Sequence, residues 1–363
     1  MNKIIWISAA VLSVAACAKN EVIPVNSGEN QEITFNVAPK TKADPDAHGH
    51  NEFAKGNVFA SWAYYLPKNK TWDANSGENY VEPKEYISGA KISNNERTGN
   101  KWKCEDKSYY WPKDGGSLTF FAYSLNKDDL ILTGGDSGFG CDVASGIHGA
   151  IDLKVNSNTD FLVADIANDK NGNVVTHFTN GVPTLFKHRL SSVAFAIKTG
   201  AAYADKTFEL TNITINKISH YGSYGQLPTE LFAAGGTDYN PVFTSTVQGI
   251  TYQPGFVGVT GVDKYIFIPQ TFEDKSYVEV KYTITTTVGS GSVTENVTRQ
   301  IKLKDLFPTK CDNSVPKQVI GGGWEMGKKY TINLTFTLDE ILWDPAVEDW
   351  DPVPAPAEGY DVK

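Results

Sequence analysis

Cysteine is scarce in this chain of 363 residues, and its scarcity limits how the fold can be stabilised. No two cysteines are spaced as C-x-x-C, which excludes a zinc ribbon. The few present are far apart in sequence, so one disulfide is possible but a dense framework is not. The four are Cys17, Cys104, Cys141 and Cys311. Stability must therefore come from burial, for which 40% apolar and 12% aromatic residues are available.

Positive charge and long apolar runs are also in short supply. The formal net charge is −9, and the only arginines are Arg97, Arg189 and Arg299. This balance argues against binding to nucleic acid and against adsorption on anionic lipid. The apolar run at the amino end is shorter than the ~20 residues that a bilayer-spanning helix needs, and no other run comes close. We therefore expect no membrane-spanning helix.

Residues 1–16 have the layout of a secretory signal peptide. Lys3 precedes a short apolar run at residues 4–12, and small residues follow it. Residues 14–17 read Val-Ala-Ala-Cys and resemble the bacterial lipobox, in which the cysteine is lipidated and becomes the first mature residue. An ordinary signal peptide with a cysteine nearby is the alternative. Because such lipoproteins carry several acyl chains, an anchor at Cys17 would be permanent.

Alternation of apolar and polar residues is the main structural signal. It starts at residues 33–37, after a polar stretch that reads as a tether, and Pro39 ends this first strand. The same period of two recurs at residues 208–215, 278–284 and 330–338, which predicts half-buried antiparallel strands. No long amphipathic helix is evident, and many short strands between turns favour all-β sandwiches.

The chain length allows two domains, and a fresh apolar run from Leu185 suggests where the second begins. The Pro-rich end should be extended. The predicted division is a signal peptide at 1–16, a tether at 17–30, an amino-terminal β-sandwich at 31–184, a carboxy-terminal β-sandwich at 185–350 and a tail at 351–363.

Catalytic signals are weak. Residues 135–138 (Gly-Asp-Ser-Gly) match the nucleophile segment of trypsin-like proteases, but the upstream His48 and His50 do not resemble that family's histidine motif, so a turn is expected. The two histidines have no third metal ligand at a suitable spacing. The acidic pair at 128–129 is typical of a solvated turn, and neither a phosphate loop nor a dinucleotide fingerprint occurs. We therefore predict no enzyme activity, no cofactor and no metal site.

Six segments, taken in order, point to one family. They are the lipobox followed by residues 32–37, Trp-Pro at 111–112 with Leu-Thr-Phe-Phe-Ala-Tyr at 118–123, and residues 159–164, 186–193, 268–270 and 347–350. Together they resemble the fimbrillin family, the type V pilins and related surface lipoproteins of Bacteroidales. The resemblance implies two tandem transthyretin-like β-sandwich domains and export as a lipoprotein of the outer membrane. It also implies assembly on the cell surface with other fimbrial subunits, into a fimbrium that serves cell adhesion.

The resemblance also implies how assembly proceeds. In the pilins a surface protease cuts after a basic residue behind the first strand, and a carboxy-terminal strand of a neighbouring subunit fills the groove that opens. Here the removable strand would be residues 33–37, and the cut would follow Lys40 or Lys42. Residues 330–338 could supply the donated strand, but their pattern favours the last core strand of their own domain. We therefore expect the donated strand to come from residues beyond 338. The predicted donor residues are Leu342, Trp343, Val347 and Trp350.

One departure leaves alternatives open. The familiar cut follows arginine, whereas the first arginine here is Arg97, so the chain is either cut after lysine or left uncut as an anchor or accessory subunit. Shaft, tip and anchor roles therefore stay open, as do the adhesion target and the pairing of the last three cysteines. The second hypothesis is a monomeric surface lipoprotein that binds glycan through exposed tryptophans, for which the eight tryptophans of the chain are the candidates. The third hypothesis is a glycoside hydrolase, but no set of catalytic residues in the sequence supports it.

Overall fold

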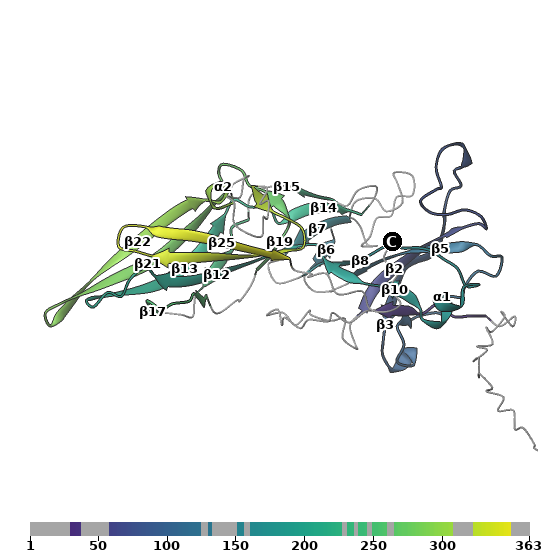
Figure 1. Cartoon of the computed structure of the whole chain (residues 1–363), viewed down its shortest axis with the longest axis horizontal. Coiled ribbons are helices and arrows are strands. Elements are labelled where there is room, and N and C mark those ends of the chain that lie inside the picture. Colours follow the sequence, from purple (N-terminus) through teal and green to yellow (C-terminus); the bar gives the residue numbers. More distant parts are fainter. Residues whose placement is uncertain are drawn as a thin grey trace, which may run out of the picture.

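The computed structural model describes residues 30–37, 58–124, 130–132, 151–155, 160–226, 231–235, 239–244, 249–259, 265–307 and 322–349. Within these ranges the chain forms twenty-five strands and only short helical segments, so the predicted all-β class is confirmed. The helical segments are η1 (Gly77–Asn79), η2 (Glu96–Thr98), α1 (Val175–Thr179) and α2 (Leu303–Leu306). None of the described helices is long and apolar enough to cross a membrane. The strands build an elongated molecule with two lobes (Figure 1).

The amino-terminal lobe is built on a seven-stranded sheet with the order β11-β8-β5-β2-β3-β4, in which β9 also pairs with β5. Its strands are β2 (Val58–Leu66), β3 (Lys84–Ser93), β4 (Lys103–Cys104), β5 (Ser117–Ser124), β8 (Leu162–Ala164), β9 (Ala167–Lys170) and β11 (Phe186–His188). All eight residues of β5 are buried, because each face of this strand packs into a different core. Phe120 enters one core and Phe121 the other, which is why the strand reads as a continuous apolar run.

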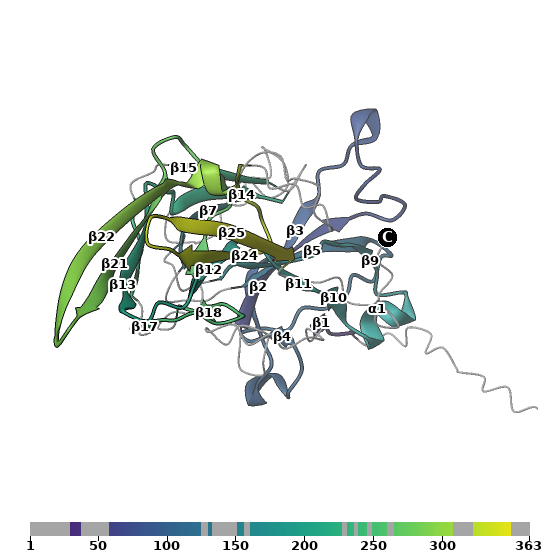
Figure 2. The same cartoon turned by 60° about the vertical axis from the view of Figure 1, so that its left-hand side comes forward.

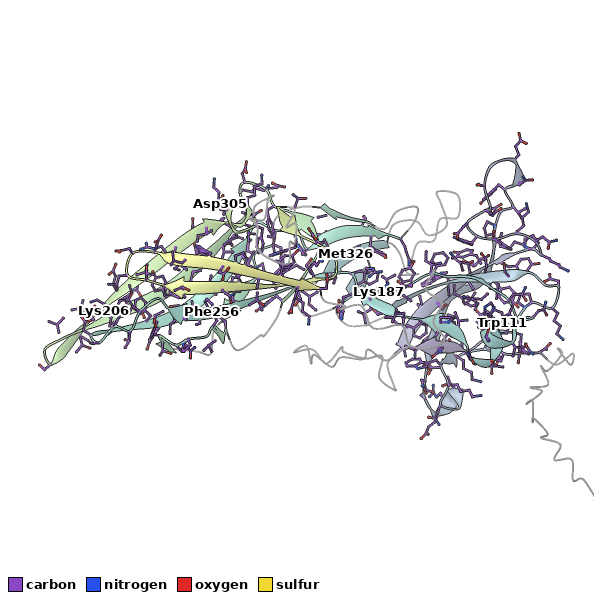
Figure 3. The ribbon with its side chains drawn as sticks, viewed as in Figure 1. Trp111, Lys187, Lys206, Phe256, Asp305 and Met326 are labelled. Atoms are coloured by element: carbon purple, nitrogen blue, oxygen red, sulfur yellow. The ribbon has the colours of Figure 1, made fainter. Side chains whose placement is uncertain are left out.

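Two short strands cover one face of this sheet. They are β1 (Phe35–Val37) and β10 (Val182–Thr184), which pair in parallel. The core between them and the sheet contains Ile33, Phe35, Phe59, Trp111 and Phe120, among others. Trp111 lies inside this lobe in Figure 3.

The carboxy-terminal lobe is a sandwich of two five-stranded sheets. One has the order β18-β12-β24-β25 with β19 also on β12, and the other has the order β16-β13-β21-β22 with β17 also on β13. The first contains β12 (Ser191–Thr199), β18 (Val257–Gly258), β19 (Tyr265–Phe267), β24 (Lys328–Phe336) and β25 (Ile341–Asp349). The second contains β13 (Lys206–Asn216), β16 (Val242–Thr244), β17 (Gly249–Ile250), β21 (Tyr277–Val288) and β22 (Gly291–Lys302). Alternate residues of both sheets meet in one apolar core, which includes Phe195, Ile213, Val280 and Ile332.

The three alternating segments of this lobe are strands, as predicted, but the expected antiparallel pairing is wrong for one neighbour. β24 ends at Phe336 rather than at residue 338 and runs parallel to β12, with Ser192 opposite Lys329 and Thr199 opposite Phe336. Its other neighbour, β25, is antiparallel. Alternation shows which residues face the core, but it contains no information about the direction of the next strand.

The two lobes share structure at their junction. A four-stranded sheet with the order β15-β14-β7-β6 joins β6 (Leu130–Leu132) and β7 (Ile151–Val155) to β14 (Tyr221–Gly225) and β15 (Leu231–Gly235), as Figure 1 shows between the lobes. A third apolar cluster also spans the junction, with Tyr123 and Phe161 on one side and Tyr224 and Ile266 on the other. Strand β11 follows residue 185 but pairs with β8 of the amino-terminal lobe. The exact division at 184 and 185 stays a prediction.

Candidate functional site: the amino-terminal strand and its groove

The first strand of the chain lies between two other segments of its lobe. On one side it pairs with β10, with Phe35 opposite Val182, and the amide of Val182 donates to the carbonyl oxygen of Thr34 at 2.8 Å. On the other side it faces residues 102–111. The amide of Ile33 donates to the carbonyl of Tyr109 at 2.7 Å, that of Phe35 to Trp102 at 2.8 Å, and that of Trp111 to Gln31 at 2.9 Å. The strand therefore satisfies backbone groups on both of its neighbours.

Alternate side chains of this segment fill the core beneath it. Ile33 and Phe35 are buried, whereas Asn36, on the opposite face of the strand, is exposed. The ring of Phe35 meets Phe59 edge-on with the centroids 5.5 Å apart, and it meets Phe120 in the same way at 5.8 Å. Removal of the strand would therefore leave an apolar trough lined by aromatic rings.

Gly181 permits the close approach of β1 and β10. Its φ of +80° lies in the left-handed region, which side chains with a Cβ rarely adopt. A Cβ at this position would also lie 3.0 Å from the carbonyl carbon of Phe35 and 3.1 Å from the amide nitrogen of Asn36. Glycine is therefore required here for two reasons. Its own backbone is in the left-handed region, and the first strand lies too close to leave room for a Cβ.

A polar contact holds the start of the strand. The carboxylate of Glu32 lies 3.0 Å from the Nζ of Lys103 and accepts a hydrogen bond from Ser108. Burial acts to raise the pKa of Glu32, but the hydrogen bond from Ser108 and the ammonium of Lys103 act in the other direction, and together they hold it below its usual value. Glu32 therefore ties the strand to residues 103–108 as an anion.

The predicted donor residues lie on an edge strand of the other lobe. β25 pairs only with β24 among the described strands, and its residues alternate between the core and solvent. Trp343 and Val347 pack against the core, whereas Leu342 is on the other face with 48% of its surface exposed. Trp350 lies outside the described residues. The structure therefore places the groove and the predicted donor strand in different lobes of one chain (Figure 1).

Several other predicted positions also lie outside the described residues. These are Cys17, Lys40, Lys42, His48, His50, the acidic pair at 128–129, the segment 135–138, Cys141 and Cys311. Cys104 is half-buried and is a free thiol.

The described residues offer little to the catalytic and glycan-binding alternatives. No cluster of three potential metal ligands occurs among them. None of the six described tryptophans is exposed: Trp62, Trp111 and Trp324 are buried, and Trp72, Trp102 and Trp343 are half-buried. The idea of exposed tryptophans is therefore wrong for this part of the chain. A cleft of about 440 Å³ lies beside β20 (Gln270–Thr271) and β23 (Gly323–Trp324). Glu325 is the only carboxylic acid among the described residues that line it, whereas a glycosidase uses two.

Sequence reasoning missed two features of this region. Residues 102–111 form the second wall of the groove, although they show no strand-like alternation. Asp160 and His188 form a buried pair in which a carboxylate oxygen contacts the ring Nδ1, next to the pairing of β8 with β11. They are 28 residues apart, so no local motif could have indicated the pair.

Comparison with known proteins shows where this fold belongs. The model of a family described as fimbrillin-like matches residues 26–350. The chain belongs to the fimbrillin-like family. A fimbrial protein from Bacteroides vulgatus has a similar structure, with a TM-score of 0.60 at 16% identity over 88% of this chain and 100% of that one. A candidate cell adhesion protein from Bacteroides uniformis gives a TM-score of 0.49, also at 16% identity, over 88% of this chain and 100% of that one. No curated protein sequence matches the chain.

The resemblance inferred from the six segments is thus confirmed. The family match covers the groove, both lobes and the edge strand β25. Membership of the fimbrillin-like family supports a structural role as a fimbrial or adhesion subunit at the cell surface, in assembly with other fimbrial subunits.

Proposed function

We propose that this fimbrillin-like protein is a lipid-anchored fimbrial subunit that polymerises by strand exchange at the outer membrane. A surface protease cuts after Lys40 or Lys42, the segment containing β1 leaves, and the carboxy-terminal strand of a neighbouring subunit takes its place. Cys17 carries the lipid during export.

The observation that best supports this proposal is the way in which β1 is held. Its backbone is hydrogen-bonded on both sides and its apolar side chains lie in the core, yet β1 itself is only three residues long. Loss of this segment exposes unpaired backbone groups and an apolar trough together, and a donated strand satisfies both. A three-residue strand also has few pairings of its own to break.

The edge strand β25 has the features of a donor. Detaching it breaks one ladder, because β24 is its only described neighbour. Trp343 and Val347 lie on the same face of β25, because successive side chains of a strand alternate between its two faces. Ile33 and Phe35 lie on one face of the first strand for the same reason. These two residues would enter the groove, and Leu342 would lie on the opposite face with the charged side chains.

The first test is the intact mass and amino-terminal sequence of the protein taken from native cell surfaces. A mature chain that begins at Thr41 or Ala43 and runs as a heat-labile ladder is the expected result. A chain that still begins at lipidated Cys17 and stays monomeric would contradict a shaft subunit, and would leave an uncleaved anchor subunit or a monomeric binding lipoprotein.

A matched pair of variants tests the processing site. The double substitution Lys40→Ala with Lys42→Ala should abolish both the cut and the ladder, whereas Lys84→Ala, at an exposed lysine of β3, should leave both unchanged. A ladder that persists in the double variant would place the cut elsewhere.

A further inference from the structure

The hairpin formed by β21 and β22 projects from the carboxy-terminal lobe. Each strand has twelve residues, and they are joined by a two-residue turn in which Gly289 has a φ of +59°. Figure 2 shows the hairpin reaching past the neighbouring strands. Residues 291–296 are exposed on both faces, and Val288 and Val293 expose 63% and 64% of their surface. These aliphatic side chains contribute little to the core of their own lobe.

The outer edge of β22 is open in the described part of the chain, where β21 is its only strand neighbour. A two-residue turn makes Val288 and Gly291 a hydrogen-bonded pair, so the odd-numbered residues of β22 bond to β21. The backbone groups of its even-numbered residues therefore point outward. Edge strands are usually protected by proline or by charge, as β25 is by Pro345 and its acidic residues. β22 has no proline, and its charged residues, Glu295, Arg299 and Lys302, are of both signs.

The side chains on the inner face of β22 form a self-complementary series. In order they are Val293, Glu295, Val297, Arg299 and Ile301. When two copies of the strand pair antiparallel about Val297, each Glu295 lies opposite an Arg299, each Val293 lies opposite an Ile301, and Val297 meets itself. In this register the outward-pointing backbone groups of the even-numbered residues also face each other and can pair.

Neighbouring registers lack this match. A shift of two residues in the pairing places Glu295 opposite Val297 or Ile301, and a shift of four places like charges opposite each other. Of the two charged residues, Glu295 is exposed to solvent. Arg299 is half-buried, and one of its terminal nitrogens donates to the carbonyl oxygen of Asp339 at 3.1 Å.

We propose that the outer edge of β22 binds the same strand of a second copy of this chain, on a two-fold axis through Val297. The two sheets then continue into one another, the exposed Val293 of each copy is covered by Ile301 of the other, and two Glu295–Arg299 pairs fix the register. This contact uses neither the groove of β1 nor the donor strand, so it stands or falls independently of strand exchange.

Sedimentation velocity of the full chain over a range of concentrations, with detergent present for the anchor, gives the primary readout. Glu295→Arg should weaken the dimer at least tenfold, because it places arginines opposite each other twice. The swap that combines Glu295→Arg with Arg299→Glu should restore it. A chain that stays monomeric throughout, or a dimer that Glu295→Arg leaves unchanged, overturns the proposal.

Disulfide trapping tests the register without changing charge. Across a two-fold axis through Val297 the two Cα atoms are ~4.5 Å apart, which is within the range of a disulfide. Val297→Cys should therefore oxidise to a covalent dimer, whereas Thr294→Cys should not, since its two copies are ~20 Å apart. The unchanged chain controls for its own cysteines. Equal trapping at both positions would indicate random collision and overturn the proposed register.

Discussion

Glu32 makes the seating of the first strand depend on pH. Because the pKa of this carboxyl is lowered in the folded chain, its contribution is complete above the unfolded value of about 4.3 and is lost as the pH falls through the lower, folded value. Glu32→Gln should remove this dependence, which we expect to be below about 1 kcal/mol because the pair is partly exposed to solvent.

Hydrogen exchange of residues 30–37, corrected for the intrinsic effect of pH, measures it. As the pH is lowered, the wild-type chain should lose protection of these amides more steeply than the Glu32→Gln variant. Glu279→Gln is the control, because Glu279 is paired with Lys281 in the other lobe and its pKa is likewise lowered by its hydrogen bonds. Equal pH profiles for the original chain and Glu32→Gln would contradict a role for Glu32 in holding β1.

Gly181→Ala should loosen the first strand more than its backbone angle alone explains. A left-handed conformation costs an alanine about 1–2 kcal/mol. Gly99 isolates that cost, since its φ is +65° and an added Cβ would meet nothing within 4 Å. At Gly181 the Cβ also meets the backbone of residues 34–36, so the strand must shift. Thermal unfolding should show Gly181→Ala as the less stable variant, and a smaller loss than that of Gly99→Ala would be the contrary result.

At the scale of the element, Phe35 is the residue that seats β1. Truncation of a buried phenylalanine costs about 3–5 kcal/mol, and here the cavity would open next to Phe59 and Phe120. Phe35→Ala should therefore release the strand, seen as faster proteolysis after residue 37. Asn36→Ala, on the exposed face of the same strand, leaves the apolar core intact and should cost less stability than Phe35→Ala. Similar proteolysis of both variants would show that the side chain of Phe35 does not seat the strand.

The strands that could be predicted from the sequence are those with one face exposed to solvent. Residues 278–284 and 330–338 alternate because one side of each strand meets the core, and the structure has strands at both. Strand β5 is buried on both faces, so Phe120 and Phe121 follow each other without alternation, and only the family resemblance indicated this segment. Parallel pairing was not predictable, because the partner of β12 is more than 120 residues away and no turn joins them.

The candidate site was predictable only in part. The first strand and its buried residues follow from the alternation at 33–37. The walls that hold it do not, since Gly181 and residues 102–111 come next to β1 only through the closure of the lobe. The buried pair of Asp160 and His188 depends on the same long-range contacts.

At the scale of the whole molecule, Phe161 connects the two lobes. It is buried in the junction cluster, with its ring stacked on Tyr123 at 6.2 Å and edge-on to Tyr224 at 5.3 Å. Phe161→Ala should cost about 3–5 kcal/mol and uncouple the lobes, so that one calorimetric transition becomes two. Phe336→Ala, in the core of the carboxy-terminal lobe, should also lower stability, but its unfolding should remain a single calorimetric transition. A single transition in Phe161→Ala would show that the shared sheet alone couples the lobes.

The parallel pairing of β12 with β24 has a mechanical consequence for a fibre joined through β25. If β25 is bound in a neighbour, as we propose, tension would enter the subunit at the Phe336 end of β24, while β12 connects to the rest of the subunit at its Ser191 end. The two strands are aligned over eight residue pairs and are pulled from opposite ends, so the load acts as shear along the ladder. All of these pairs must then yield together rather than one after another, as they would in peeling. The strand order of this lobe would thus let a filament resist being pulled apart by flow.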